Sequence, residues 1–185
     1  MLNRILYIVV LLALVAGVVF AQPSAPAGAA SPSMVLEQQL SRVEKELVPM
    51  VGEMPDSKFN FAPTNGEFKG VRTFAEQAKH IAVVNYVIGG AILGEKPPVT
   101  GADAANAKTK QQIVKLLNDS FAYVHKAFGS VTAQNLTELI PSPFGSGQAT
   151  RLGLAIALIG DQRDHYGQIV VYFRMNGMVP PASRR

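Results

Sequence analysis

Two histidines and one aspartate are the residues whose types and spacing best suit chemistry. The chain contains three histidines, His80, His125 and His165, and Asp161 stands four residues before the last of them. Residues four apart lie on the same face of a helix, so a carboxylate oxygen and an imidazole nitrogen can point toward one place. With His80 supplied by a facing helix, His80, Asp161 and His165 form a candidate ligand set for a metal ion.

This ligand set suits a divalent metal. Neutral imidazole nitrogens and a carboxylate oxygen are typical ligands of zinc, nickel, manganese and iron, and three protein ligands leave a position open for water or a substrate. A purely structural explanation also holds, because aspartate and histidine four apart are common on helices and a single histidine often serves as a hydrogen-bonded core residue. The residues alone leave both explanations open. His125, which stands beside Lys126, is more typical of a surface or boundary position than of a ligand.

The composition excludes several other chemistries. The chain has no cysteine, which rules out disulfides, thiolate metal ligands, a cysteine nucleophile and lipid attachment at a lipoprotein-type cysteine. The formal net charge is only +4, and the basic residues are scattered without a dense run or interleaved aromatics, so we expect no nucleic-acid partner. The expected partner is a small molecule whose identity the sequence does not specify.

Four amphipathic segments are expected to position these residues. In each segment apolar residues recur at helical spacing with charged or polar residues between them, and no segment alternates as a strand does. This pattern predicts an all-α protein built as a four-helix bundle. The predicted helices run from about Met34 to a bend or end at Pro49, from Thr73 to Leu93, from Ala104 to Phe128 and from Thr150 to Met175.

The N-terminus is typical of a signal peptide. A short basic region at Asn3–Arg4 precedes an uncharged apolar run from Ile5 to Val19, and Ala21 is a suitable residue before a cleavage site. We therefore expect a signal peptide at residues 1–21, a flexible Pro/Ala/Ser linker at 22–33 and one folded domain at 34–185. The predicted location is periplasmic or extracellular. The alternative is a membrane anchor, in which the apolar segment remains uncleaved.

Three segments resemble the DinB-like family. They are Lys58–Thr64, Thr73–His80 and Asp164–Pro181, and the last is the most specific. The similarity covers nearly all of the chain after the linker. It implies an antiparallel DinB-like four-helix bundle and, as in typical members, a divalent metal held by one histidine of the second helix and an H-x-x-x-H pair of the last helix.

The ligand pattern of the family is matched only in part. His80 and His165 fall on two of the expected histidines, whereas Asp161 stands where the first histidine of the pair is expected. Either a site of two histidines and one carboxylate with altered metal preference is retained, or metal binding is lost while the fold persists.

Several relatives are thiol-dependent transferases or isomerases, in which the metal lowers the pKa of a bound thiol or water. The resemblance therefore implies a metal-dependent hydrolase or transferase of unspecified substrate. The alternative is a non-catalytic helical module for binding or assembly. Relatives commonly pair through helix faces, which also makes a homodimer an expectation.

Overall fold

The computed structural model describes residues 28–184 of the chain. The predicted signal peptide and most of the linker lie outside these residues. Within them, no helix combines the length and apolar character needed to cross a membrane. The elements are α1 (Pro32–Glu53), η1 (Asp56–Lys58), α2 (Phe74–Leu93), α3 (Gly101–Ala105), α4 (Lys110–Gly129), β1 (Leu139–Pro141), β2 (Gln148–Thr150), α5 (Arg151–Met175) and η2 (Pro181–Ser183).

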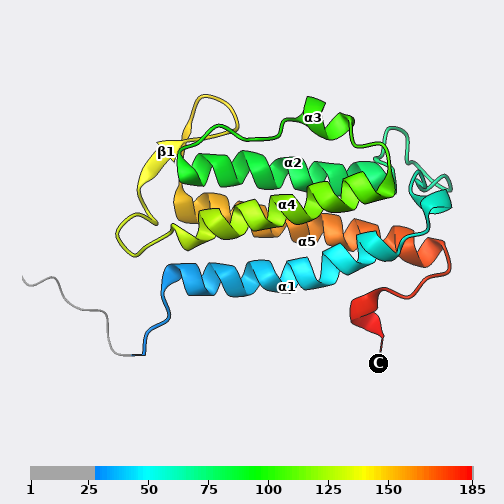
Figure 1. The fold of residues 1–185 in the computed structure, drawn as a ribbon, viewed down its shortest axis with the longest axis horizontal. Helices are drawn as coiled ribbons and strands as arrows, with labels where there is room; N and C mark the ends of the chain where they lie inside the picture. The colour runs from blue at the N-terminus through cyan, green and yellow to red at the C-terminus, as the bar shows by residue number, and fades with distance from the viewer. Residues whose placement is uncertain (1–27, 185) are drawn as a thin grey trace, which may run out of the picture.

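Four long helices form the body of the protein, as the apolar periodicity predicted (Figure 1). Helices α2 and α1 each pack against both α4 and α5, so every long helix has two long neighbours. The apolar faces meet in one continuous core. Its largest side chains include the fully buried phenylalanines Phe74, Phe121, Phe128 and Phe173.

The helix directions correct the simple antiparallel arrangement that we expected. Helices α2 and α4 run the same way, because Asn85 of α2 contacts Ser120 while Gly89, one turn further along, lies against Tyr123. Figure 1 shows the reason: the connection after α2 runs back along the whole length of the helices before α4 begins. The short helix α3 lies within this connection and packs against the outside of α2.

The predicted helix from Ala104 to Phe128 is in fact two helices. Thr109 begins α4, since its hydroxyl oxygen accepts a hydrogen bond from the Gln112 N–H at 3.2 Å. The Gln112 side chain accepts in return from the Lys108 and Thr109 N–H groups at 2.8 and 3.0 Å. Such a reciprocal cap satisfies the unpaired N–H groups that open a helix. It favours a new start at this point over a continuous helix.

A small hairpin between α4 and α5 was missed by the sequence pattern. Strands β1 and β2 pair antiparallel, with Ile140 opposite Ala149. Each strand has three residues, which is too short to show the alternation that identifies a strand. Before the hairpin, residues 133–137 form a turn, in which the Leu136 N–H donates to the Thr132 carbonyl at 3.0 Å and the Glu138 N–H to the Asn135 carbonyl at 3.1 Å.

The helix starts nearest the candidate ligands follow the sequence closely. Thr73 caps α2 with Glu76 in the expected reciprocal arrangement, and Thr150 caps α5 through the Gly153 N–H. Helix α1 continues through Pro49 and ends at Glu53. The two helices that carry the candidate ligands, α2 and α5, run in opposite directions, because Gln77 pairs with Gln168 whereas Asn85 pairs with Gln162.

Candidate metal centre

The three predicted ligands come together between α2 and α5. One ligand atom from each of His80, Asp161 and His165 lies within 4.8 Å of the other two. Asp161 Oδ1 is 3.5 Å from His165 Nε2 and 4.0 Å from His80 Nε2. The imidazole rings meet edge to face, with centroids 4.6 Å apart. His165 is buried, and the other two side chains are partly buried.

These spacings are those of groups that could share one ion. Two ligands on a tetrahedral zinc ion with bonds of about 2.0–2.1 Å are roughly 3.4 Å apart. The 3.5 Å separation of Asp161 and His165 already matches that value, and the His80 ring needs only a small movement. The two distances from Asp161 to the imidazole nitrogens, 3.5 and 4.0 Å, exceed those of good hydrogen bonds, so the side chains converge on one place without hydrogen bonding one another.

Asp161 also carries an unpaired oxygen. Its Oδ2 atom is buried and has no hydrogen-bond partner among the described residues. In a protein without a bound ion, a buried carboxylate oxygen that lacks a hydrogen-bond partner lowers the stability of the folded state. A bound cation would remove that cost, so the carboxylate fits a metal better than it fits an ordinary core position.

A chain of hydrogen bonds fixes the ring of His165. Its Nδ1 atom lies 2.7 Å from Gln77 Oε1, the Gln77 amide donates to Gln168 Oε1, and the Gln168 amide donates to Asp164 Oδ2, the last two also at 2.7 Å. The Asp164 carboxylate can only accept, which sets the direction of every bond in the chain. The Nδ1 atom of His165 therefore carries a hydrogen, and its Nε2 atom faces Asp161. A histidine held in this way by a second hydrogen bond is the usual form of a metal ligand.

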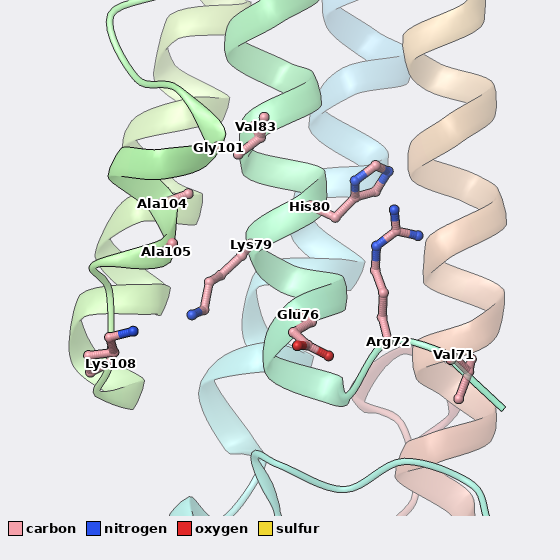
Figure 2. A pocket seen from close by; sticks show the side chains of 11 residues that line it. Val71, Arg72, Glu76, Lys79, His80, Val83, Gly101, Ala104, Ala105 and Lys108 are labelled. Carbon is pink, nitrogen blue, oxygen red and sulfur yellow. The ribbon is translucent and has the colours of Figure 1, made fainter. Parts of the chain in front are cut away.

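His80 is kept in the neutral form that a ligand needs. Burial lowers the pKa of its imidazole, and the positive charge of Arg72 and the nearby His165 ring lower it further, against the opposing effect of Asp161. No hydrogen bond to the His80 ring occurs within residues 28–184, so packing alone holds it. Its outer edge lines a cavity of about 740 Å³. Figure 2 shows this cavity, with the ring of His80 and the side chain of Arg72 reaching toward each other.

The backbone before α2 is fixed from α5. The hydroxyl of Tyr172 donates to the Arg72 carbonyl at 3.0 Å, and its ring packs edge to face on Phe61. Tyr172 thus positions the start of α2 without touching the ligands.

Asn85 lies in a separate polar cluster of the core. It donates to Ser120 at 3.0 Å and accepts from Gln162 at 2.7 Å, and all three side chains are fully buried. These bonds tie α2 to α4 and α5. Asn85 therefore links helices and does not bond the candidate ligands.

His125 is tied to α1 and lies apart from the candidate centre. Its Nδ1 atom is 2.5 Å from Glu37 and its Nε2 atom is 2.9 Å from Glu44. Burial alone would lower the pKa of His125, but the two carboxylates outweigh it and raise the pKa. The expected boundary position is confirmed, because the side chain is 30% exposed.

The polar residues behind the ligands were not predicted. Gln77 stands three residues before His80 and Gln168 three residues after His165, so each lies beside a ligand on the same helix face. Gln77 is also an amide on a face that is otherwise apolar, since Phe74, Ala78 and Ile81 are buried around it. A polar residue in a buried register, one turn from a candidate ligand, is the signal that could have identified it.

The fold and the ligand cluster describe a mostly helical protein with a histidine and carboxylate site between two helices. The family model of the DinB superfamily matches residues 39–169. Because this match covers most of the chain, the protein belongs to the DinB superfamily. No curated protein matches the sequence.

Solved structures of similar fold agree with this assignment. A DinB-like protein from Bacillus cereus has a TM-score of 0.61 at 18% identity, over 79% of this chain and 93% of that one. A DinB-like protein from Bacillus subtilis has a TM-score of 0.58 at 18% identity, over 80% of this chain and 99% of that one. A conserved protein from Enterococcus faecalis has a TM-score of 0.61 at 17% identity, over 78% of this chain and 96% of that one. At these identities the likeness establishes the fold alone.

Proposed function

We propose that this protein is an exported, metal-binding member of the DinB superfamily, a four-helix bundle behind a signal peptide. His80, Asp161 and His165 would hold a divalent ion, zinc, nickel, manganese or iron, and the protein would act as a hydrolase or transferase on a small molecule. The observation that carries the proposal is the convergence of the three ligand atoms. Export and a homodimer rest on the sequence alone.

The buried oxygen of Asp161 and the orientation of His165 support a metal over a plain polar cluster. A polar cluster satisfies its members by hydrogen bonding to one another. Here Asp161 Oδ2 has no partner among the described residues, while the Nε2 atom of His165 faces the cluster as an acceptor. A cation between His165 Nε2 and Asp161 Oδ1, which lie 3.5 Å apart, would satisfy both groups.

The chemistry would be that of an ion with three protein ligands. Such an ion supplies a Lewis acid that lowers the pKa of a bound water or thiol. The residues of the chain supply the rest: Gln77 holds His165 in one tautomer, the lowered pKa of His80 keeps its nitrogen available, and the cavity beside His80 admits the substrate.

Calorimetric titration of zinc and nickel into the chain beginning at Gln22, after dialysis against chelator, tests the proposal. We expect one ion per chain, and loss of binding in His80→Ala. A matched control is His125→Ala, which removes the histidine outside the centre and should leave the stoichiometry unchanged.

Binding that is equal in wild type and His80→Ala would refute the centre. The absence of any binding by the wild-type chain would favour the alternative function, a non-catalytic helical module for binding or assembly. Circular dichroism of each variant shows whether the helical fold is intact and so separates loss of a ligand from loss of structure.

A further inference from the structure

The cavity beside His80 carries an excess of positive charge. It is bounded by the start of α2 and by α3, and its charged residues are Arg72, Glu76, Lys79 and Lys108. Three cations against one carboxylate leave two net positive charges. Figure 2 shows Arg72 and Lys79 on opposite sides of α2, with Lys108 on the segment that follows α3.

The cations of this cavity are not neutralised by the fold. No ion pair within residues 28–184 involves Arg72, Lys79 or Lys108, although other basic residues of the same region do pair, such as Lys110 with Asp56. The one carboxylate, Glu76, accepts from both the N–H and the hydroxyl of Thr73, and its charge also interacts with Lys79 and Arg72. Two net positive charges thus remain available to a ligand.

The wall opposite α2 leaves room for a ligand. It is built from Gly101, Ala104 and Ala105, which carry at most a methyl group. A methyl group placed on Gly101 would meet no atom within 4 Å. The small side chains therefore leave space between α3 and α2, and the volume of about 740 Å³ lies in the range of small-molecule sites.

We propose that this cavity binds the anionic group, a carboxylate or a phosphate, of the small molecule on which the centre acts. Lys79 and Lys108 would hold the anion on the α3 side of α2, and the rest of the molecule would extend across α2, past Arg72, to His80. This assignment rests on the proposed function, because the other end of the same small molecule would react at the metal centre. A divalent ion with one carboxylate ligand is itself net positive, which also favours an anionic ligand.

Inorganic phosphate is a direct probe, used on the isotope-labelled chain from Gln22 in the presence of chelator. We expect it to shift the amide resonances of residues 71–80 and 101–108 in nuclear magnetic resonance spectra. The double variant Lys79→Gln/Lys108→Gln should weaken phosphate binding about tenfold, since each exposed charge contact contributes roughly a factor of three to five. The matched control is Arg42→Gln/Lys45→Gln, which makes the same charge change on α1 and should alter the affinity less than about twofold.

A neutral substitution provides a second test. Ala105→Leu fills the space between α3 and α2 without changing the charge, and it should also weaken phosphate binding. Its amide spectrum shows directly whether the fold persists. Full affinity in both Ala105→Leu and the double variant would overturn the anion site.

The outcomes separate this site from the metal centre. If the α1 control weakens phosphate binding equally, phosphate responds to the overall positive charge of the protein and not to this cavity, which would overturn the proposal. Phosphate shifts that occur only after zinc is added would place the anion on the metal, which overturns the anion site and supports the proposed function. Binding in chelator that requires Lys79 and Lys108 supports the anion site, and the separate zinc titration shows whether the metal centre binds an ion.

Discussion

The Nδ1 atom of His165 lies 2.7 Å from the Oε1 atom of Gln77, a residue 88 positions earlier in the chain. This contact decides which ring nitrogen of His165 faces the candidate centre. Because the chain of hydrogen bonds ends on the Asp164 carboxylate, the proton of the imidazole is fixed on the side away from Asp161.

Replacing Gln77 should weaken metal binding without removing a ligand. In Gln77→Leu the Nδ1–H of His165 loses its acceptor and the ring is free to turn, so we expect zinc affinity to fall about 10- to 100-fold. Gln77→Glu keeps an acceptor and should retain most of the affinity. Competition with a chelating dye measures both. Wild-type affinity in Gln77→Leu would mean that the hydrogen bond has no bearing on the site.

Asp161→His should raise the affinity for zinc and nickel. A third imidazole nitrogen competes better for these borderline metals than a carboxylate oxygen does. Because the ion binds only the folded state, the melting temperature should rise in the presence of zinc and change little in chelator. Differential scanning calorimetry with and without zinc measures this. A melting temperature that rises equally in chelator would point to better packing in place of metal binding.

The contact of His125 with Glu37 and Glu44 should make stability depend on pH. The folded state raises the pKa of His125 above its ordinary value of 6.5, so this stabilisation is complete below about pH 6.5 and is lost as the pH rises through the folded pKa. Urea unfolding of wild type and His125→Gln between pH 5.5 and 8.5 measures it. The difference in the free energy of unfolding between the two should shrink toward high pH, and a constant difference would contradict the contact.

Two glycines should respond with opposite sign to the same substitution. A methyl group on Gly90 would lie 2.9 Å from the Glu95 carbonyl oxygen and 3.2 Å from the Pro97 nitrogen, so Gly90→Ala should destabilise the fold by about 1–3 kcal/mol. Gly167 lies exposed in α5, where a methyl group meets nothing within 4 Å. Gly167→Ala should stabilise the fold by about 0.5–1 kcal/mol. Chemical denaturation of both variants tests the pair, and equal effects would contradict it.

Export should leave a chain that begins at Gln22. Cleavage after Ala21 is expected from the apolar run and the small residue that follows it. N-terminal sequencing of the protein recovered outside the cytoplasm tests this. A chain that begins at Met1 and stays with the membrane fraction would favour the anchor.

The helices and the ligand cluster could be predicted because their signals are local. Thr73 with Glu76 marks the start of α2 within four residues, and the spacing of Asp161 and His165 places both on one helix face. The similarity to the DinB-like family then paired α2 with α5. Each of these inferences needed only short-range spacing or a matched motif.

The remainder depended on contacts between distant residues. The break before α4 was missed although its signal is local, because residues 108–112 contain no apolar residue and Thr109 with Gln112 forms a cap that is visible in the sequence. The parallel course of α2 and α4 follows from how the connection between them packs, which no pattern within either helix records. Gln77 and Arg72 matter only through their neighbours in the fold, and their types alone do not single them out.

The parallel course of α2 and α4 has a consequence for the order of folding. Asn85 and Ser120 are 35 positions apart, whereas Gln77 and His165 are 88 positions apart. Closing the longer loop costs more chain entropy, so we expect α2 and α4 to associate before α5 docks. The centre then exists only once the last helix is in place. An ion would therefore bind after most of the chain has folded and would stabilise the folded state. It would have no part in the initial collapse of the chain.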